Sequence, residues 1–211
     1  MSIKLDKYKM LSGLDFPPIE SSGATPIFVR SQENAFVYVE DPYIVCRSKM
    51  IPKLKVTVGG TDYYVEPVEH IHASWWTVKR YGFGTYEWKA KMGGVNSGEE
   101  YAGGFEYHHG FPLEGLITII YLNGVLKFWT SWGGNQTQTN ITGVDVTVEH
   151  TYRIQWTSSS VQLWIDGVSK AIHTTNIPQA PMSFFSEACA YRGTATQDAY
   201  AYFKLGSLRK L

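Results

Sequence analysis

Short runs of alternating apolar and polar residues dominate the chain, and helical periodicity is nearly absent. In residues 84–92, "GTYEWKAKM", the even-numbered positions from Tyr86 to Met92 are apolar and the odd-numbered ones are polar. Residues 152–156 and 161–165 alternate in the same way. Because successive side chains of a strand point to opposite faces, these runs predict strands with one face in a core.

Thirteen such runs, separated by Gly, Asn, Asp and Pro, are expected as strands. They are residues 34–41, 43–50, 53–60, 61–72, 84–92, 103–109, 115–122, 125–132, 144–148, 151–157, 161–167, 183–188 and 199–208. Asn-Gly and Asp-Gly turns follow two of them, and these dipeptides favour tight hairpins. The pattern predicts an all-β fold, an antiparallel sandwich or barrel, formed by one domain over residues 1–211. Residues 1–30, which include "FPPIESSGATP", are expected to form an irregular arm that wraps the sandwich.

The run "LITIIYL", residues 116–122, is apolar on both faces apart from Thr118. We expect this strand in the middle of a sheet, with both of its sides covered.

Composition narrows the classes of function. Nineteen basic and nineteen acidic residues give a formal net charge of zero, which argues against a nucleic-acid partner. No apolar run is long enough to cross a membrane, and lysines near the start predict no signal peptide. The cellular location stays open, and an extracellular or particle-associated one is compatible. Cys46 and Cys189 form one bridge or stay as two buried thiols.

Three motifs, in this order, resemble glycoside hydrolase family 16, the laminarinase and lichenase type. "YGFGTYEWKAKM" is similar to its Tyr-Gly-x-Gly strand, "EHTYRIQWTSSSVQLWIDGV" to its later hairpin, and "AYAYFKLGSLRKL" to its closing strand. The resemblance runs from about His70 to the end. It implies a concanavalin A-like jelly roll, in which one of two stacked sheets curves into a sugar-binding groove.

The family's catalytic strand carries Glu-x-Asp-x-Glu, because retaining hydrolysis needs two carboxyl groups about 5–5.5 Å apart. Side chains at i, i+2 and i+4 of a strand share one face. The matching positions here are Leu116, Thr118 and Ile120, and a bulged register would place Tyr121 last. Leu116 and Ile120 can neither attack an anomeric carbon nor donate a proton, and no register of this strand supplies two acids. The sequence therefore predicts that the catalytic carboxylates of the family are lost.

Other polar residues offer weaker candidate sites. Glu106, Glu114 and Glu187 are the fallback carboxylates for a hydrolase whose acids have moved, although a solvated or hydrogen-bonded carboxylate is the simpler reading of each. The pairs His70/His72 and His108/His109 lack diagnostic metal-ligand spacing, so no metal site is predicted. Because the family's sandwiches often bind calcium, a structural calcium ion stays open, with Asp145, Asp166 and Asp198 as candidate ligands.

Aromatic residues, 15% of the chain, are the better candidates for binding. Flat rings can stack on the C–H face of a sugar while amides bind its hydroxyl groups. Candidate carbohydrate-binding residues are Trp76, Trp129, Trp132, Asn135 and Gln136. The last two lie in "SWGGNQTQTN", which is expected to be a loop. Core positions for Trp76 and Trp129 are an equal alternative.

The first hypothesis is a non-catalytic, lectin-like domain that binds a polysaccharide and derives from a glycan hydrolase. The second is a structural or assembly protein on the same jelly roll, a virion or surface component that self-associates. An apolar former cleft favours it, because such a surface needs a cover: the N-terminal arm, residues 93–104 or a partner chain. The third is an active hydrolase with relocated carboxylates.

Overall fold

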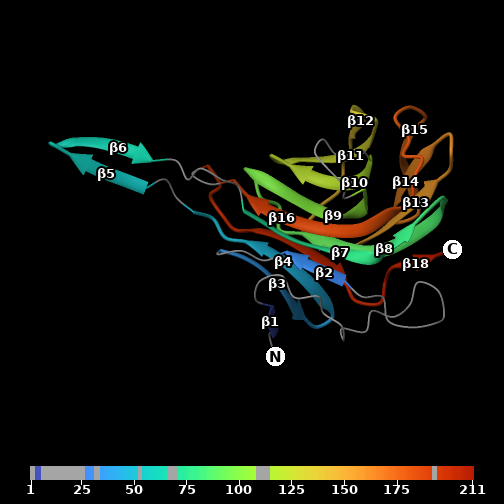
Figure 1. The fold of residues 1–211 in the computed structure, drawn as a ribbon, viewed down its shortest axis with the longest axis horizontal. Helices are drawn as coiled ribbons and strands as arrows, with labels where there is room; N and C mark the ends of the chain where they lie inside the picture. The colour runs from blue at the N-terminus through green and yellow to red at the C-terminus, as the bar shows by residue number, and fades with distance from the viewer. Residues whose placement is uncertain are drawn as a thin grey trace.

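The computed structural model describes residues 3–5, 27–30, 34–51, 54–65, 71–107, 115–191 and 194–211. These residues form two stacked antiparallel sheets and one separate hairpin (Figure 1). The all-β sandwich expected from the sequence is thereby confirmed. Within the described part of the chain, no helix has the length and hydropathy needed to cross a membrane.

The first sheet has nine strands, and eight of them follow one another in hydrogen-bonded order. In that order they are β1 (Ile3–Leu5), β3 (Ala35–Glu40), β4 (Tyr43–Ser48), β17 (Ala199–Lys204), β8 (Gly84–Met92), β13 (His150–Trp156), β14 (Val161–Ile165) and β15 (Val168–His173). The ninth, β18 (Arg209–Lys210), pairs with β8. Some strands that are distant in sequence pair directly in this sheet. The pairing of β4 with β17, for example, joins the N-terminal and C-terminal parts of the chain.

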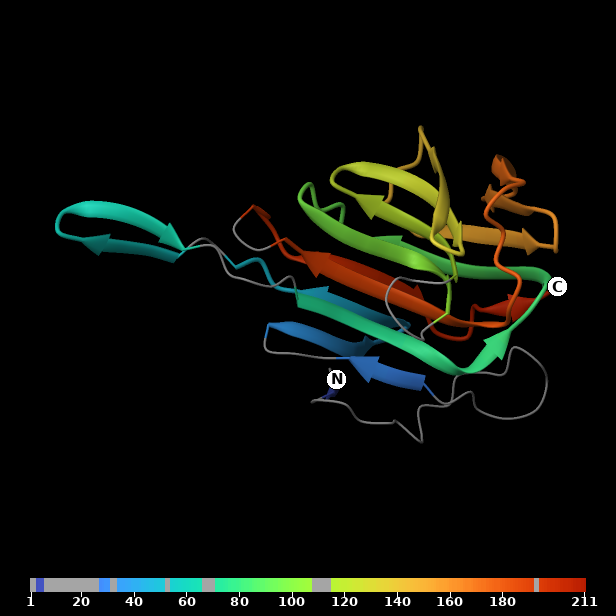
Figure 2. The same cartoon turned by 45° about the horizontal axis from the view of Figure 1, so that its top comes forward.

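The second sheet has seven strands and lies over the first (Figure 2). Its order is β12 (Asn135–Asn140), β11 (Val125–Trp132), β10 (Gly115–Leu122), β9 (Gly98–Glu106), β16 (Met182–Ala190), β7 (Ile71–Tyr81) and β2 (Ile27–Arg30). As its two-sided apolar pattern predicts, β10 lies inside the sheet, and residues 115–120 are all buried.

Large aromatic side chains fill the space between the sheets. Trp88, Tyr152 and Trp156 are at most 1% exposed, which confirms the inward faces expected from strand alternation. Their polar atoms are mostly paired: Trp88 Nε1 donates to the Ala102 carbonyl at 2.8 Å, and Trp156 Nε1 donates to the Pro178 carbonyl at 3.0 Å. Such bonds remove the cost of burying an indole N–H.

A hairpin of β5 (Leu54–Val58) and β6 (Thr61–Val65) projects away from the sandwich (Figures 1 and 2). Its turn contains Gly59 and Gly60, both at positive φ. Residues 55–63 are exposed throughout. The sequence predicted these strands but not their separation from both sheets.

Three sequence expectations about local structure are wrong. Residues 135–140, expected as a loop, form edge strand β12. Residues 93–104, named as a loop among three possible covers of the cleft, enter strand β9 at Gly98. Residues 144–148, expected as a strand, are irregular, and the Val146 carbonyl accepts a hydrogen bond from Met92 N at 2.8 Å. Polar edge strands and single inward side chains escape a search for alternating apolar residues.

The expected N-terminal arm lies mostly outside the described residues. Of residues 1–30, the structure describes only strands β1 and β2, at opposite ends of this segment. Cys46 and Cys189 are both buried and free.

Candidate functional site

Strand β10 has two faces with different surroundings. Ile117 and Ile119 belong to the core between the sheets, and Leu116, Thr118 and Ile120 point the other way. We call this second side, which faces away from the first sheet, the outer face of the second sheet. In cross-strand pairs the side chains share a face. The register therefore places Glu106, opposite Leu116, and Trp129, opposite Thr118, on the outer face as well.

The positions matched to the catalytic strand are closed to solvent. Leu116 is 3% exposed, and Thr118 and Ile120 are 0% exposed. The Thr118 hydroxyl donates to the Gly103 carbonyl at 3.2 Å, so its polar atom is used within the sheet. These three side chains bring no carboxylate to the outer face.

Carboxylates do occur elsewhere on the outer face. Glu106 on β9 and Glu187 on β16 lie close enough to interact electrostatically, and His72 on β7 faces both. Burial and the Glu187 charge raise the pKa of Glu106 to about 8, although His72 opposes the shift. Two of the three fallback carboxylates therefore share one region. The third, Glu114, lies outside the described residues.

His72 is held in place by two neighbours. Its Nδ1 lies 2.6 Å from Glu187 Oε1. Burial disfavours the imidazolium, but hydrogen bonds to Cys189 and Glu187 outweigh it and raise the pKa of His72 to about 11. Of the four histidines singled out in the sequence, this is the one that the structure describes. Glu99, which also reaches this cluster, was not foreseen.

The three aspartates considered as calcium ligands have separate partners. Asp145 caps the Thr147 N–H and hydroxyl, Asp166 pairs with His150, and Asp198 pairs with Arg47. Among the described residues, His72, Glu99 and Glu187 form the one group of potential metal ligands.

The five predicted carbohydrate-binding residues separate into three places. Trp129 and Gln136 lie on the outer face, where Gln136 is opposite Ser131. Trp76 also faces outward, but three strands separate its strand from β11. Of the five, only Trp132 and Asn135 line the same pocket.

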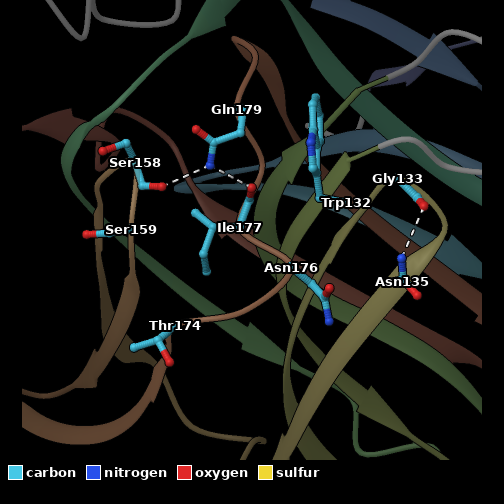
Figure 3. A pocket seen from close by; sticks show the side chains of 9 residues that line it. All are labelled: Trp132, Gly133, Asn135, Ser158, Ser159, Thr174, Asn176, Ile177 and Gln179. Atoms are coloured by element: carbon cyan, nitrogen blue, oxygen red, sulfur yellow. Dashed lines mark hydrogen bonds between the residues drawn. The ribbon is translucent and has the colours of Figure 1, made fainter.

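This pocket has a volume of about 470 Å³ and is lined by the β11–β12 hairpin of the second sheet and by the segments that follow β13 and β15 of the first sheet (Figure 3). We call it the Trp132 pocket. The turn after β11 supplies Trp132 and Asn135, and the loops on the opposite wall supply Ser158, Thr174 and Gln179. All nine lining residues are uncharged. The sequence indicates one wall through Trp132 and Asn135, but the other wall comes from irregular loops that carry no recognisable pattern.

Hydrogen bonds fix the two walls to each other. The buried His173 ring bonds to Thr130 on β11 at 2.8 Å and to Thr139 on β12 at 3.0 Å. Asn176 Nδ2 donates to the Thr137 hydroxyl at 3.0 Å. These contacts join the edge of the second sheet to the segment after β15, so the pocket is formed before any ligand arrives.

The pocket also exposes hydrogen-bond acceptors. Gln179 Nε2 donates to the Ser158 and Ile177 carbonyls, both at 2.9 Å, which holds its amide in one orientation (Figure 3). Within the described structure, the side-chain carbonyls of Asn135, Asn176 and Gln179 accept no hydrogen bond from protein. They are available to hydroxyl donors of a ligand.

Comparison with known proteins supports the architecture. No family model matches the sequence. A β-glucanase of Bacillus amyloliquefaciens is 30% identical over 136 residues, which are 58% of this chain. The match spans about half of that relative, 53% of its length.

Solved structures agree over more of the chain. The Bacillus licheniformis β-glucanase has a TM-score of 0.58 at 18% identity. The matched region covers 99% of this chain and 91% of the β-glucanase chain. The laminarinase catalytic domain of Thermotoga maritima MSB8 has a TM-score of 0.59 at 17% identity, over 85% of this chain and 80% of its own.

The fold is that of the β-glucanases. A lichenase from a mouse hindgut metagenome repeats the likeness, with a TM-score of 0.55 at 14% identity over 97% of this chain and 92% of its own. At these identities the structural matches establish the concanavalin A-like sandwich, and the chemistry of this glucanase-like chain has to be argued from its own side chains.

Proposed function

We propose that this glucanase-like domain binds a neutral polysaccharide of the β-glucan class and does not cleave it. One observation carries the proposal: the Trp132 pocket combines an indole ring with three carboxamides and contains no charged residue. A pyranose offers flat C–H faces and many hydroxyl groups but no charge. An aromatic surface with amide partners is complementary to that chemistry.

The absence of cleavage rests on β10. Hydrolases of this fold need two carboxyl groups across the scissile bond. At the corresponding positions, Leu116, Thr118 and Ile120 are buried and carry no acid. A glycan on the outer face would therefore not reach a pair of acids on this strand. The ligand class comes from the relatives, which are named as β-glucanases, laminarinase and lichenase.

Affinity electrophoresis tests the proposal directly. The full chain would be run through gels that contain a β-1,3-glucan, a mixed-linkage β-1,3-1,4-glucan or an acidic polysaccharide of similar length. Retardation by a neutral glucan, and none by the acidic polymer, is expected. Equal mobility in every gel would refute the binding function.

A second candidate function, assembly, is favoured by the β5–β6 hairpin. Val56 and Val58 share one face with Tyr63, because Val56 and Tyr63 are a cross-strand pair and Val58 lies two residues from Val56 on the same strand. Val58 is 61% exposed and Tyr63 is 55% exposed.

The opposite face of the hairpin is polar, with an ion pair of 2.7 Å between Lys55 Nζ and Asp62 Oδ2. A lone two-stranded hairpin is marginally stable in water, so an apolar face of this kind gains stability from a partner. A second copy of the chain is the partner we infer.

Light scattering at rising protein concentration distinguishes the two candidates. Assembly predicts an increase in mass that the double substitution Val56→Thr and Val58→Thr removes. Lys55→Gln, on the polar face, is the matched control and should still associate. A constant monomer mass for the unaltered chain would reject assembly and leave glycan binding untouched.

A further inference from the structure

The cluster of His72, Glu99 and Glu187 lies on the outer face, away from the Trp132 pocket. Cys189 on β16 is opposite His72 on β7 and opposite Glu99 on β9. Glu187 precedes Cys189 by two residues and so points to the same side. Three neighbouring strands therefore bring four potential donor side chains to one place.

The donor atoms converge. One ligand atom from each of His72, Glu99 and Glu187 lies within 4.8 Å of the other two. Ligand atoms around a tetrahedral zinc ion are about 3.3 Å apart, given bonds of about 2.0–2.1 Å. Side-chain rotation would have to bring the three donor atoms to this spacing when an ion binds. The His72 and Glu187 side chains remain 28% and 18% exposed, which leaves a route for an ion.

Hydrogen bonds orient the Glu99 carboxylate toward this point. Tyr101 donates to its Oε2 at 2.8 Å, and Tyr191 donates to its Oε1 at 2.5 Å. Each carboxylate oxygen keeps a lone pair beyond these bonds. Outer partners of this kind are typical of metal ligands, whose orientation they fix.

Charge balance also favours a cation. Neither Glu99 nor Glu187 makes an ion pair with Lys or Arg among the described residues, and the His72 imidazole is paired with Glu187. An excess of acids around one imidazole is relieved by a divalent ion.

We infer that His72, Glu99 and Glu187 form a binding site for a divalent transition-metal ion of the zinc class. One imidazole nitrogen with two carboxylates matches zinc-type ligand chemistry. Calcium prefers six to eight oxygen ligands, which this cluster does not supply. The site involves no residue of the Trp132 pocket, so metal binding and glycan binding can fail independently.

Isothermal titration of the full chain, stripped with a chelator and then dialysed, tests the site. Zn²⁺ is the probe and Ca²⁺ the comparison. The wild type should bind one Zn²⁺ per chain, and His72→Gln and Glu187→Gln should each weaken binding at least about tenfold. Thermal unfolding in the presence of Zn²⁺ gives a second readout, because an ion that binds only the native state raises the Tm.

His150→Gln is the matched control. His150 Nδ1 lies 2.6 Å from Asp166 Oδ2, the same separation as in the His72–Glu187 pair, but no third ligand joins it in the described structure. This variant should bind Zn²⁺ like the wild type. Absence of Zn²⁺ binding by the wild type, unchanged binding by a folded His72→Gln, or equal affinity for Ca²⁺ would overturn the inference.

Discussion

Trp129 and Trp132 lie three residues apart on β11 and point to opposite sides of the second sheet. Trp129 is opposite Thr118 on the outer face, and Trp132 is opposite Gly115 at the rim, beside the Trp132 pocket. An odd separation along a strand forces this division. The two indoles therefore act as natural controls for each other.

Trp132→Ala should abolish retardation by a neutral glucan, because the stacking surface of the pocket is lost. Trp129→Ala should leave that retardation within about twofold, since its side chain lies on the other face. Affinity electrophoresis of both variants, with circular dichroism as the fold check, measures this difference. Loss of binding in Trp129→Ala alone would move the glycan site to the outer face.

The Trp132 ring rests against the backbone of Gly115. A Cβ atom at Gly115 would lie 3.0 Å from Trp132 Cε3 and Cζ3 and 3.0 Å from Met182 Sδ. Gly115→Ala should therefore displace the ring, weaken glucan binding and cost about 1–3 kcal/mol of unfolding free energy.

Gly82→Ala serves as the control for that substitution, because a Cβ atom there meets nothing within 4 Å. Denaturant unfolding and affinity electrophoresis of the two variants give the comparison. If Gly115→Ala binds and unfolds like the wild type, the ring does not depend on this contact.

The core faces and the middle position of β10 could be predicted because apolar side chains repeat every two residues. The pocket could be predicted only in part. Asn135 was chosen for its amide, but the loop at Ser158 and Gln179 offers no pattern that links it to Trp132. Likewise His72 and Glu187 meet through strand register, which the order of residues alone does not reveal.

Glu87 on β8 joins two arginines on the outside of the first sheet. Arg153 Nη2 lies 2.7 Å from Glu87 Oε2, and Arg209 bonds Oε1. Among the described ion pairs, neither Lys89 nor Lys91, the lysines that follow Glu87 on β8, is its partner. Both lysines neighbour Glu87 on one strand, whereas the arginines come from β13 and β18 across the sheet.

The Glu87 pair predicts a dependence of stability on acid. Burial opposes ionisation, but the hydrogen bonds from Arg209 and Arg153 outweigh it and lower the pKa of Glu87. A lowered native pKa stabilises the fold above the unfolded-state value of about 4.3, and this contribution disappears as the pH falls through the native value.

Glu87→Gln should lower the unfolding free energy by about 1–3 kcal/mol at pH 7, and the difference from wild type should shrink below about pH 4. Denaturant unfolding across this range measures it. Glu40→Gln, at an exposed position, is the control and should change little. A Glu87→Gln effect that stays constant down to low pH would contradict the ion-pair account.

His173 predicts a second acid sensitivity, at higher pH than that of Glu87 and located in the pocket walls. Burial lowers the pKa of His173 below its usual value. The unfolded chain therefore takes up the proton first, and stability should fall as the pH drops below about 6.5.

In His173→Gln, the fall in stability between pH 7 and pH 5 should be smaller than in the wild type. Glucan binding at pH 7 should also weaken, because the hydrogen bonds to Thr130 and Thr139 are altered. Thermal unfolding at several pH values, with His150→Gln as the control at a histidine outside the pocket, measures the first effect. An unchanged decline would assign the acid sensitivity to other groups.

The central claim is recognition of a β-glucan without cleavage, and one incubation tests both halves. Purified chain is mixed with a β-1,3-glucan or a mixed-linkage glucan; bound protein is measured by co-sedimentation, and new reducing ends are counted in the same tube. We predict saturable binding that Trp132→Ala removes, with reducing ends no higher than in buffer. Reducing ends that rise with wild type but not with Glu106→Gln or Glu187→Gln would contradict the claim and show a hydrolase that uses those two acids.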